Sequence, residues 1–211
     1  MTNSVTFEGI LPLKSRTETK RAINPEGSHV DDKGQQRGLE RLHKTLAKQM
    51  HEHYTEINGP VADVDIAFVD QTTYAEFIAS LSTPSASFTF EVEAPGGGAA
   101  ILDYSLPIAY GILEYPGVDK PDGQMEAKHR EILGKAFKRD LASIESIWSS
   151  VVDIKGSNAQ FETNPEYMKI AEGGDNVALI GFEVHFPHAS GRTILCYPIS
   201  LLEPVLPKLA D

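Results

Sequence analysis

An internal repeat of about ninety residues constrains this chain more than any other feature of its sequence. Three short segments recur in the same order, at shifts of 88, 92 and 93 residues. They are the pairs Val64–Ile66 and Val152–Ile154, Phe90–Val92 and Phe182–Val184, and Ile101–Tyr104 and Ile194–Tyr197. Solenoid repeats are shorter, about 20 to 50 residues. The repeat therefore predicts one domain made of two similar halves.

Length and composition narrow the classes of protein further. The chain has 211 residues, is 41% hydrophobic and 23% charged, and so fits a single globular domain. Its net charge of −11 argues against a general nucleic-acid binder, which needs clustered Lys and Arg. The single cysteine leaves no disulfide within the chain and no cysteine-based metal cage. Without an apolar run of membrane-spanning length or a signal peptide, we expect a cytoplasmic protein with no membrane insertion.

Residues 1–35 have the composition of a flexible leader, because neither helical nor strand periodicity is present. One apolar group interrupts it, formed by Phe7, Ile10, Leu11 and Leu13. We expect an extended arm that lies in a groove of its own domain, with docking on a partner as the alternative.

Hydrophobic periodicity and turn residues predict the elements of both halves. The first half reads as a helix over 35–57, a strand over 61–69, a helix over 71–81, a hairpin over 87–93 and 99–104, and a short helix over 105–113. After a connector at 118–124, the second half reads as a helix over 125–151, a strand beginning at Val152, a hairpin over 177–186 and 192–198, and a helical end over 199–209. This order predicts a layered α/β domain with approximate twofold symmetry.

The residues that could carry chemistry do not assemble a catalytic or metal site. His51 and His53 are two positions apart on a helix and therefore point in different directions, unlike helical metal ligands. His185 and His188 lack a third ligand, and Cys196 lies within a strand, as a buried structural thiol does. Neither a Gly-x-Ser-x-Gly nor a His-Glu-x-x-His motif occurs. The sequence therefore predicts a binding or assembly module without a cofactor.

Several ordered segments resemble one known family, the flagellar motor switch protein FliM, over its middle domain. The similar segments are Leu39–His43, Gln71–Leu81 with Pro84, Glu162–Tyr167, Gly181–Val184, Ser190–Gly191, Leu195–Pro198 and Leu202–Val205. Together they cover about residues 37–209.

The resemblance implies a three-layer α/β/α sandwich of the CheC-like type, spanning residues 36–211, with halves at about 36–117 and 125–209. It implies a non-catalytic component of the cytoplasmic rotor ring at the flagellar basal body, on the inner face of the cell membrane. The partners that the family implies are FliG, bound through a Gly-Gly-x-Gly loop, neighbouring copies in the ring, and phosphorylated CheY. Phosphorylated CheY binds an N-terminal peptide and then the middle domain, which biases the direction of rotation.

Three departures from the family accompany the resemblance. The FliG-binding loop falls on Glu114, Tyr115, Pro116 and Gly117, so only Pro116 and Gly117 fit the glycine-rich pattern. The segment Phe7–Leu13 is at best a remote counterpart of the CheY-binding peptide. No SpoA-type domain follows Asp211, so FliN is not an expected partner of this chain; a natural short form and an excised piece would both end there.

Two alternatives stay open beside the switch component. A divergent FliM-like paralogue that binds another partner is favoured by the changed loop. A CheC-like phosphatase would need Glu-x-x-Asn on each long helix, where the two side chains orient a water molecule. Here Glu52, Glu56, Glu131 and Glu145 are followed three residues later by Thr55, Gly59, Gly134 and Trp148. We therefore do not expect an enzyme.

Overall fold

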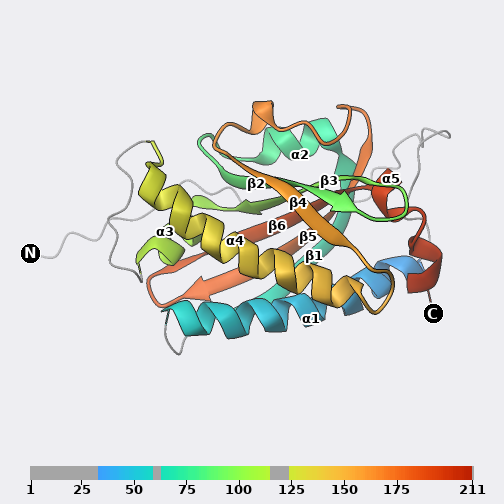
Figure 1. Ribbon diagram of the computed structural model, residues 1–211, viewed down its shortest axis with the longest axis horizontal. Coiled ribbons are helices and arrows are strands. Elements are labelled where there is room, and N and C mark those ends of the chain that lie inside the picture. Colours follow the sequence, from blue (N-terminus) through green and yellow to red (C-terminus); the bar gives the residue numbers. More distant parts are fainter. Residues whose placement is uncertain (1–32, 59–62, 115–123, 211) are drawn as a thin grey trace, which may run out of the picture.

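The computed structural model describes residues 33–58, 63–114 and 124–210 (Figure 1). In chain order the elements are α1 (Lys33–Asn58), β1 (Asp63–Thr73), α2 (Tyr74–Ser80), β2 (Ala86–Glu93), β3 (Gly98–Tyr104), α3 (Leu106–Glu114), α4 (Ala127–Trp148), β4 (Lys155–Glu162), the 3-10 helix η1 (Pro165–Tyr167), β5 (Asn176–Phe186), β6 (Ala189–Pro198), α5 (Ile199–Leu202) and the 3-10 helix η2 (Leu206–Leu209). The predicted leader group Phe7–Leu13 lies outside the described residues.

The two halves repeat one order of elements, as the sequence repeat predicts. A helix, a strand, a short helix, a hairpin and another helix follow one another twice. The six strands form one sheet in the order β1-β5-β6-β3-β2-β4, and all described pairs are antiparallel. Counting inward from the two edges gives equivalent strands of the two halves: β1 and β4, then β5 and β2, then β6 and β3. The twofold axis therefore passes between β3 and β6, and the predicted α/β fold is confirmed.

Strand pairing also shows that one of the three sequence matches was misleading. Val64 of β1 pairs with Val184, and Gly156 of β4 pairs with Val92. Since Val184 and Val92 are equivalent in the repeat, Val64 corresponds to Gly156 and not to Val152. The strand predicted to begin at Val152 is therefore wrong, because β4 begins at Lys155. The amide of Val152 still donates to the carbonyl of Trp148 at 2.8 Å, and its side chain packs on the core. Apolar residues here close a helix rather than start a strand.

Other boundaries differ by a few residues for local reasons. Gln71 stays in β1, and α2 begins after Thr73, whose hydroxyl accepts a hydrogen bond from the Glu76 amide at 3.3 Å. The predicted hairpin turn at residues 94–98 is confirmed, and Gly97 there has a φ of 55°. β6 begins at Ala189 rather than Arg192, because Phe186 and Ala189 still pair across the second hairpin.

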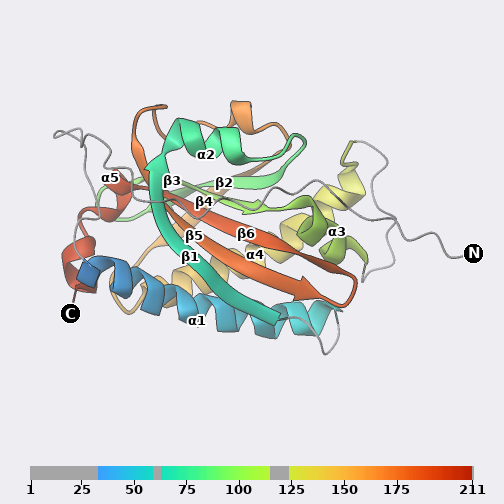
Figure 2. The same ribbon diagram turned by 180° about the vertical axis from the view of Figure 1, so that it is seen from behind.

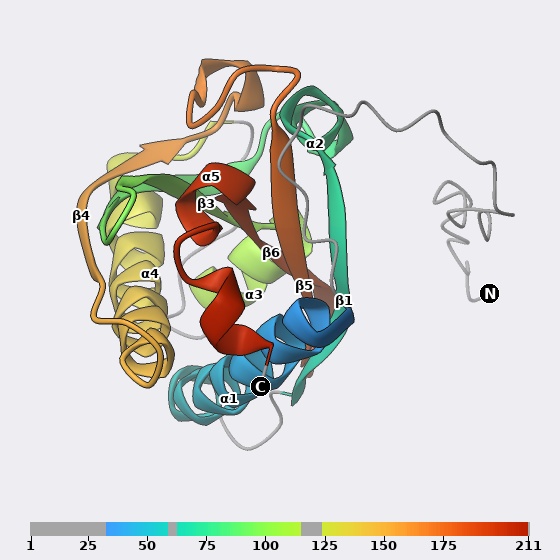
Figure 3. The same ribbon diagram turned by 90° about the vertical axis from the view of Figure 1, so that its right-hand side faces the viewer.

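Helices cover both faces of the sheet. Figures 2 and 3 show α1 and α4 on one side and α2 on the other, with α3 and α5 beside the long helices. The main core lies between the sheet and α1, α3, α4, α5 and η2. A smaller core on the outer face joins α2 to the segment around η1; its buried members are Tyr74, Phe77, Ile101, Met168, Val177, Leu179 and Cys196. The predicted three layers and the predicted buried thiol are both present.

The long helices are amphipathic, as their periodicity predicts. On α1, Leu39, Leu46 and Met50 are fully buried, whereas Arg37 and Lys48 on the opposite side are exposed. Among the described residues, no helix combines the length and the apolar character that crossing a bilayer requires.

Candidate functional site

The loop predicted to bind a partner joins α3 to α4. Glu114 ends α3 and is exposed, whereas Tyr115, Pro116 and Gly117 lie outside the described residues. In Figure 1, α3 lies at one end of the molecule with the start of α4, the C-terminal end of α1 and the β5–β6 turn. We call this the α3 end. The loop therefore leaves and re-enters the described domain at the α3 end.

The α3 helix is held firmly against the second hairpin. Its residues Ile108, Ile112 and Leu113 are fully buried. At Gly111 the helix approaches Phe186 so closely that an added Cβ would lie 2.3 Å from the ring. The Ser105 amide donates to the Arg192 carbonyl at 2.9 Å, and the Arg192 amide donates back to the Ser105 hydroxyl at 3.0 Å. The first end of the loop is thus anchored to β6.

The second end of the loop is fixed by the start of α4. Met125 is buried, and the Glu126 amide donates to Nδ1 of buried His129 at 3.0 Å. Nε of Arg130 donates to the Met125 carbonyl at 3.1 Å. The first contact satisfies one of the amides that a helix start leaves unpaired, and the second ties the preceding residue to the helix. Both ends of the loop are therefore held by packed elements. Of the predicted site residues, only Glu114 lies within the described residues.

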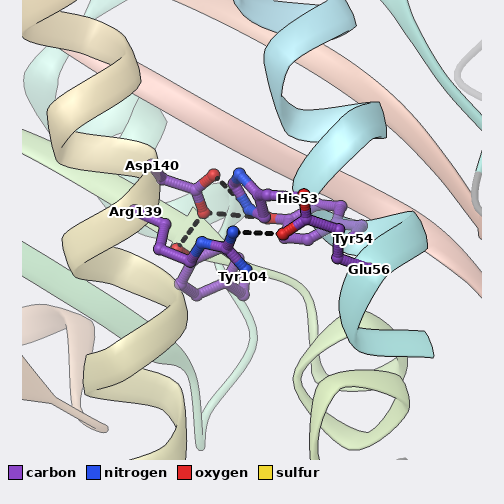
Figure 4. A network of polar contacts seen from close by, with 6 residues as sticks. All are labelled: His53, Tyr54, Glu56, Tyr104, Arg139 and Asp140. Carbon is purple, nitrogen blue, oxygen red and sulfur yellow. Dashed lines mark hydrogen bonds and ion pairs between the residues drawn. The ribbon is translucent and has the colours of Figure 1, made fainter.

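Behind the α3 end lies a buried polar network centred on Asp140 of α4 (Figure 4). Its carboxyl oxygen Oδ2 accepts hydrogen bonds from the hydroxyls of Tyr54 at 2.9 Å and Tyr104 at 2.5 Å. Nε2 of His53 lies 3.0 Å from the other oxygen, Oδ1. Since these residues belong to α1, β3 and α4, one carboxyl group links two long helices to the central strand that precedes α3.

Burial decides what this network can do. Asp140, Tyr54 and Tyr104 are all 0% exposed. Burial, followed by the proximity of Asp140, raises the pKa of Tyr54 and of Tyr104 well above the ordinary tyrosine value. The tyrosines therefore stay protonated and donate to the carboxyl group. The network therefore has no access to solvent and links the helices and β3 from inside the domain.

A surface ion pair covers the network. Arg139 on α4 bonds to Glu56 on α1, and both side chains are substantially exposed (Figure 4). Exposed pairs of this kind contribute about 0–1 kcal/mol to stability. The pair bridges the same two helices as Asp140, but the buried carboxyl group is the stronger constraint.

The symmetry-related position at the other end of the helices is chemically different. Tyr197, which corresponds to Tyr104, accepts a hydrogen bond from Nε1 of Trp148 at 3.0 Å. Nε2 of His43 lies 3.4 Å from the same hydroxyl, and its Nδ1 lies 2.8 Å from the Leu39 carbonyl. Burial lowers the pKa of His43 to about 4, so the ring is neutral at neutral pH. The carboxyl-centred network is therefore specific to the α3 end.

The glutamates of α4 that were tested against the Glu-x-x-Asn pattern make other contacts. Glu145 accepts a hydrogen bond from the Gly156 amide at 2.7 Å, and Trp148, three residues later, is buried against Tyr197. Glu131 pairs with Lys135 on the same helix at 2.8 Å. Neither glutamate has an amide side chain in place to orient a water molecule.

The histidines that the sequence analysis considered as metal ligands have other roles. His53 contacts Asp140, whereas His51 is exposed on the helix surface. Nδ1 of His185 lies 3.0 Å from the Ser190 hydroxyl across the β5–β6 turn. Within residues 33–58, 63–114 and 124–210, no group of three or more His, Cys, Asp or Glu side chains is arranged to hold a metal ion.

Asp140 was not among the residues predicted from the sequence, although a signal for it was present. Asp140 lies four residues after Ala136 and four before Ile144, on the apolar face of α4. A carboxylate at an apolar position must find partners, because an unpaired buried charge is very costly. Its partners, Tyr54 and Tyr104, lie 86 and 36 residues away, so local patterns do not reveal them.

Comparison with known proteins gives consistent matches. A family model described as flagellar motor switch protein FliM matches residues 32–211. FliM of Bacillus subtilis (strain 168) is 28% identical over 184 residues, which cover 84% of this chain and 55% of that protein. FliM of Thermotoga maritima is 29% identical over 185 residues, covering 85% of this chain and 55% of that protein. The chain thus spans about half the length of the curated relatives it matches.

Solved structures share the fold at low identity. A chain of the FliM–SpeE complex from H. pylori has a TM-score of 0.78 at 22% identity, covering 84% of this chain and 95% of that chain. A chain of the FliG–FliM complex from H. pylori has a TM-score of 0.75 at 21% identity, with 83% and 99% covered. A CheC-like superfamily protein from Shewanella sp. PV-4 has a TM-score of 0.52 at 9% identity, with 74% and 96% covered. These likenesses establish a fold that is shared with CheC-like proteins.

Proposed function

Because the chain belongs to the FliM family of flagellar motor switch proteins, we propose that it acts as a non-catalytic component of the motor switch. It would lie in the cytoplasmic rotor ring at the flagellar basal body, on the inner face of the cell membrane. The observation that carries this proposal is the family match over residues 32–211. The functional unit would be the domain over residues 36–211, with halves at about 36–117 and 125–209.

The absence of catalysis is part of the proposal. The polar network around Asp140 is closed to solvent, and the glutamates of the long helices lack the Asn three residues later that a CheC-like phosphatase uses. A rotor component has to transmit force and state changes between partners. A buried network that joins α1, β3 and α4 suits this task, because it resists relative movement of the helices that carry the α3 end.

FliG is the first proposed partner, and the loop Glu114–Gly117 is its proposed contact. A FliG–FliM complex from H. pylori includes a relative with the same fold. Here Glu114 and Tyr115 stand where the family loop has two glycines, and a side chain makes positive φ less favourable than glycine does. We propose that this surface binds through the Tyr115 ring and the Glu114 charge, since interface hot spots are enriched in tyrosine.

Neighbouring copies and phosphorylated CheY are further proposed partners. Copies would lie side by side in the ring. The leader residues Phe7, Ile10, Leu11 and Leu13 are the proposed partner-binding segment for CheY. A paralogue that uses the same fold for another partner is the second candidate, and the changed loop is the observation that favours it.

Titration of the purified chain with the middle domain of FliG from the same organism tests the proposal by calorimetry. We expect micromolar binding that is lost in a Tyr115→Ala, Pro116→Ala variant. Glu52→Ala, an exposed change on α1, is the matched control and should bind normally. If the folded wild-type chain does not bind FliG, the paralogue becomes the better account. If binding survives the loop variant, the contact lies elsewhere.

A further inference from the structure

A groove on the outer face of the sheet has no role in the proposed function. It has a volume of about 950 Å³ and lies between α2 and residues 165–175. We propose that the N-terminal segment of the same chain, Ile10–Arg21, docks in this groove. The inference does not depend on FliG binding, because it concerns the opposite side of the sheet from α1 and α4.

The floor of the groove is apolar and only partly covered. Ile78 and Leu81 on one side and Ile170 on the other are half-buried, and they pack on the smaller outer core. Tyr167, next to the groove, is 71% exposed and is the one large hydrophobic side chain of the described residues that is largely exposed. Exposed aromatic residues beside apolar grooves are typical of peptide-binding surfaces.

The rim of the groove is acidic. Glu166, Glu172 and Asp175 line it and are exposed, and Lys169 is the one cation among its described lining residues. Within the described residues, none of these three carboxylates forms an ion pair with a Lys or Arg side chain. An apolar floor with an uncompensated acidic rim fits a segment that combines apolar and basic residues.

The leader contains a segment of that chemistry. Ile10, Leu11 and Leu13 are followed by four cations and a single acid over residues 10–21. The cations are Lys14, Arg16, Lys20 and Arg21. The segment therefore has a net charge of +3, although the chain as a whole has a net charge of −11. The apolar residues would fill the floor, and the cations would meet the acidic rim.

A second hollow allows a comparison. It has a volume of about 430 Å³, lies between α1 and β1, and is lined by Lys33, Arg37 and Glu40 together with strand residues. Its charged residues favour an acidic rather than a basic segment, so charge disfavours this hollow as the docking site of the leader.

The length of the leader permits this docking. Sixteen residues, 17–32, separate Arg16 from the start of α1. Extended, they span up to about 55 Å. A compact domain of about 180 residues has a radius of gyration of about 16 Å and is therefore about 40 Å across. Since the segment is tethered, its effective concentration at the groove is high, and modest affinity suffices for occupancy.

Docking would make the leader and the groove compete with outside partners. A protein that binds the leader would first have to release it from the groove, and a protein that binds the groove would expose the leader. The apparent affinity for such a partner equals the intrinsic affinity multiplied by the fraction of chains in which the leader is undocked.

Paramagnetic relaxation measured by NMR on the full chain tests the proposal. Ser15→Cys places a single nitroxide label between Lys14 and Arg16, since native Cys196 is fully buried and burial raises its pKa. We expect selective loss of amide signal along the groove, at Ala75 and Ala79 and over 169–173. Signals on the exposed face of α4, such as Lys135, should keep their intensity. Signal loss spread evenly over the surface would overturn the proposal.

Charge reversal provides the matched pair of variants. Glu166→Lys with Glu172→Lys should abolish the selective signal loss, whereas Glu52→Lys, which makes a similar change on α1, should preserve it. Identical behaviour of the two variants would contradict charge-directed docking. In a mixture of isotope-labelled chain without nitroxide and unlabelled chain with nitroxide, we expect no loss. Loss at the groove in that mixture would mean that the leader docks on a second copy, which overturns docking within one chain.

Discussion

Leu102 of β3 pairs directly with Leu195 of β6, and the two residues occupy the same position in the two halves of the chain. The twofold axis therefore passes through this pair. On either side of it, Ile101 pairs with Cys196 and Asp103 pairs with Ile194. A rotation about the axis turns the first of these pairs into the second. The same symmetry holds at the edges of the sheet, because β1 pairs with β5 and β4 pairs with β2. Each half thus contributes its first strand to the hairpin of the other, and the halves depend on each other for a complete sheet.

The Asp140 network gives the first prediction. Asp140→Ala should lower the free energy of unfolding by about 2–6 kcal/mol, because each of two buried donors left unsatisfied costs about 1–3 kcal/mol. The hydroxyls of Tyr54 and Tyr104 lose their acceptor in this variant. Denaturation by urea measures the change. Arg139→Ala, which removes the exposed pair with Glu56, is the control and should cost no more than about 1 kcal/mol. Equal effects of the two variants would contradict the central role of Asp140.

The buried ring of His43 predicts a dependence of stability on pH. Its folded pKa of about 4 lies below the ordinary value of 6.5, because burial disfavours the charged ring. Between these values the unfolded chain binds more protons, so the contribution is complete above about pH 6.5 and is lost as the pH falls towards 4. His43→Phe should remove this loss, which amounts to at most about 3 kcal/mol. The measurement is the difference in unfolding free energy between variant and wild type from pH 4 to 7. A difference that does not change with pH would refute the assignment.

Asp103 predicts a dependence of the opposite sign. Burial raises its pKa to about 6 from an ordinary value of 3.8, although the Ser87 hydroxyl donates to it at 2.6 Å and opposes the shift. The folded state therefore holds the proton more tightly, and the stabilising contribution present below about pH 3.8 is lost as the pH rises through 6. Asp103→Asn keeps an acceptor for Ser87 and should stabilise the protein at pH 8 by about 1–3 kcal/mol. Thermal unfolding at pH 8 and pH 3.5 tests this, since the advantage should vanish at the lower pH.

Replacing two helical glycines with alanine should change the stability of the protein in opposite directions. At Gly38 of α1 an added Cβ would lie 2.0 Å from the carbonyl oxygen of Leu209, so Gly38→Ala should displace η2 and destabilise the protein. At Gly134 of α4 an added Cβ would meet nothing within 4 Å, so Gly134→Ala should stabilise it by about 0.5–1 kcal/mol. Chemical denaturation of both variants provides the test, and a stabilised Gly38→Ala variant would show that η2 does not pack on α1 in solution.

Much of the fold follows from local patterns. The apolar stripe of α1, the turn at Gly96–Gly98 and the second hairpin are visible in the sequence, because each depends on residues that are close along the chain. The strand predicted to begin at Val152 was wrong because that prediction also used only residues that are close along the chain. Its apolar residues have the local appearance of a strand, but they are used to pack the end of α4 on the core.

The candidate site was less accessible to sequence reasoning. The loop at Glu114 was identified by resemblance to a family, and its neighbourhood depends on contacts that no spacing encodes. Gly111 is 75 residues from the Phe186 ring that it touches, and Tyr104 is 36 residues from Asp140. Such contacts follow from how the helices are placed on the sheet, which sequence periodicity does not specify.

Local hydrophobic patterns and turn residues are enough to predict two similar halves, each with a long amphipathic helix and an antiparallel hairpin. The exchange of first strands between the halves, the contacts of Asp140 with α1 and β3, and the acidic groove beside α2 become visible only in the folded chain. The physical reason is distance along the chain. Pairing between strands and burial of a carboxyl group are settled by partners many residues away, and their free energy is gained only when the whole sheet and its covering helices have assembled.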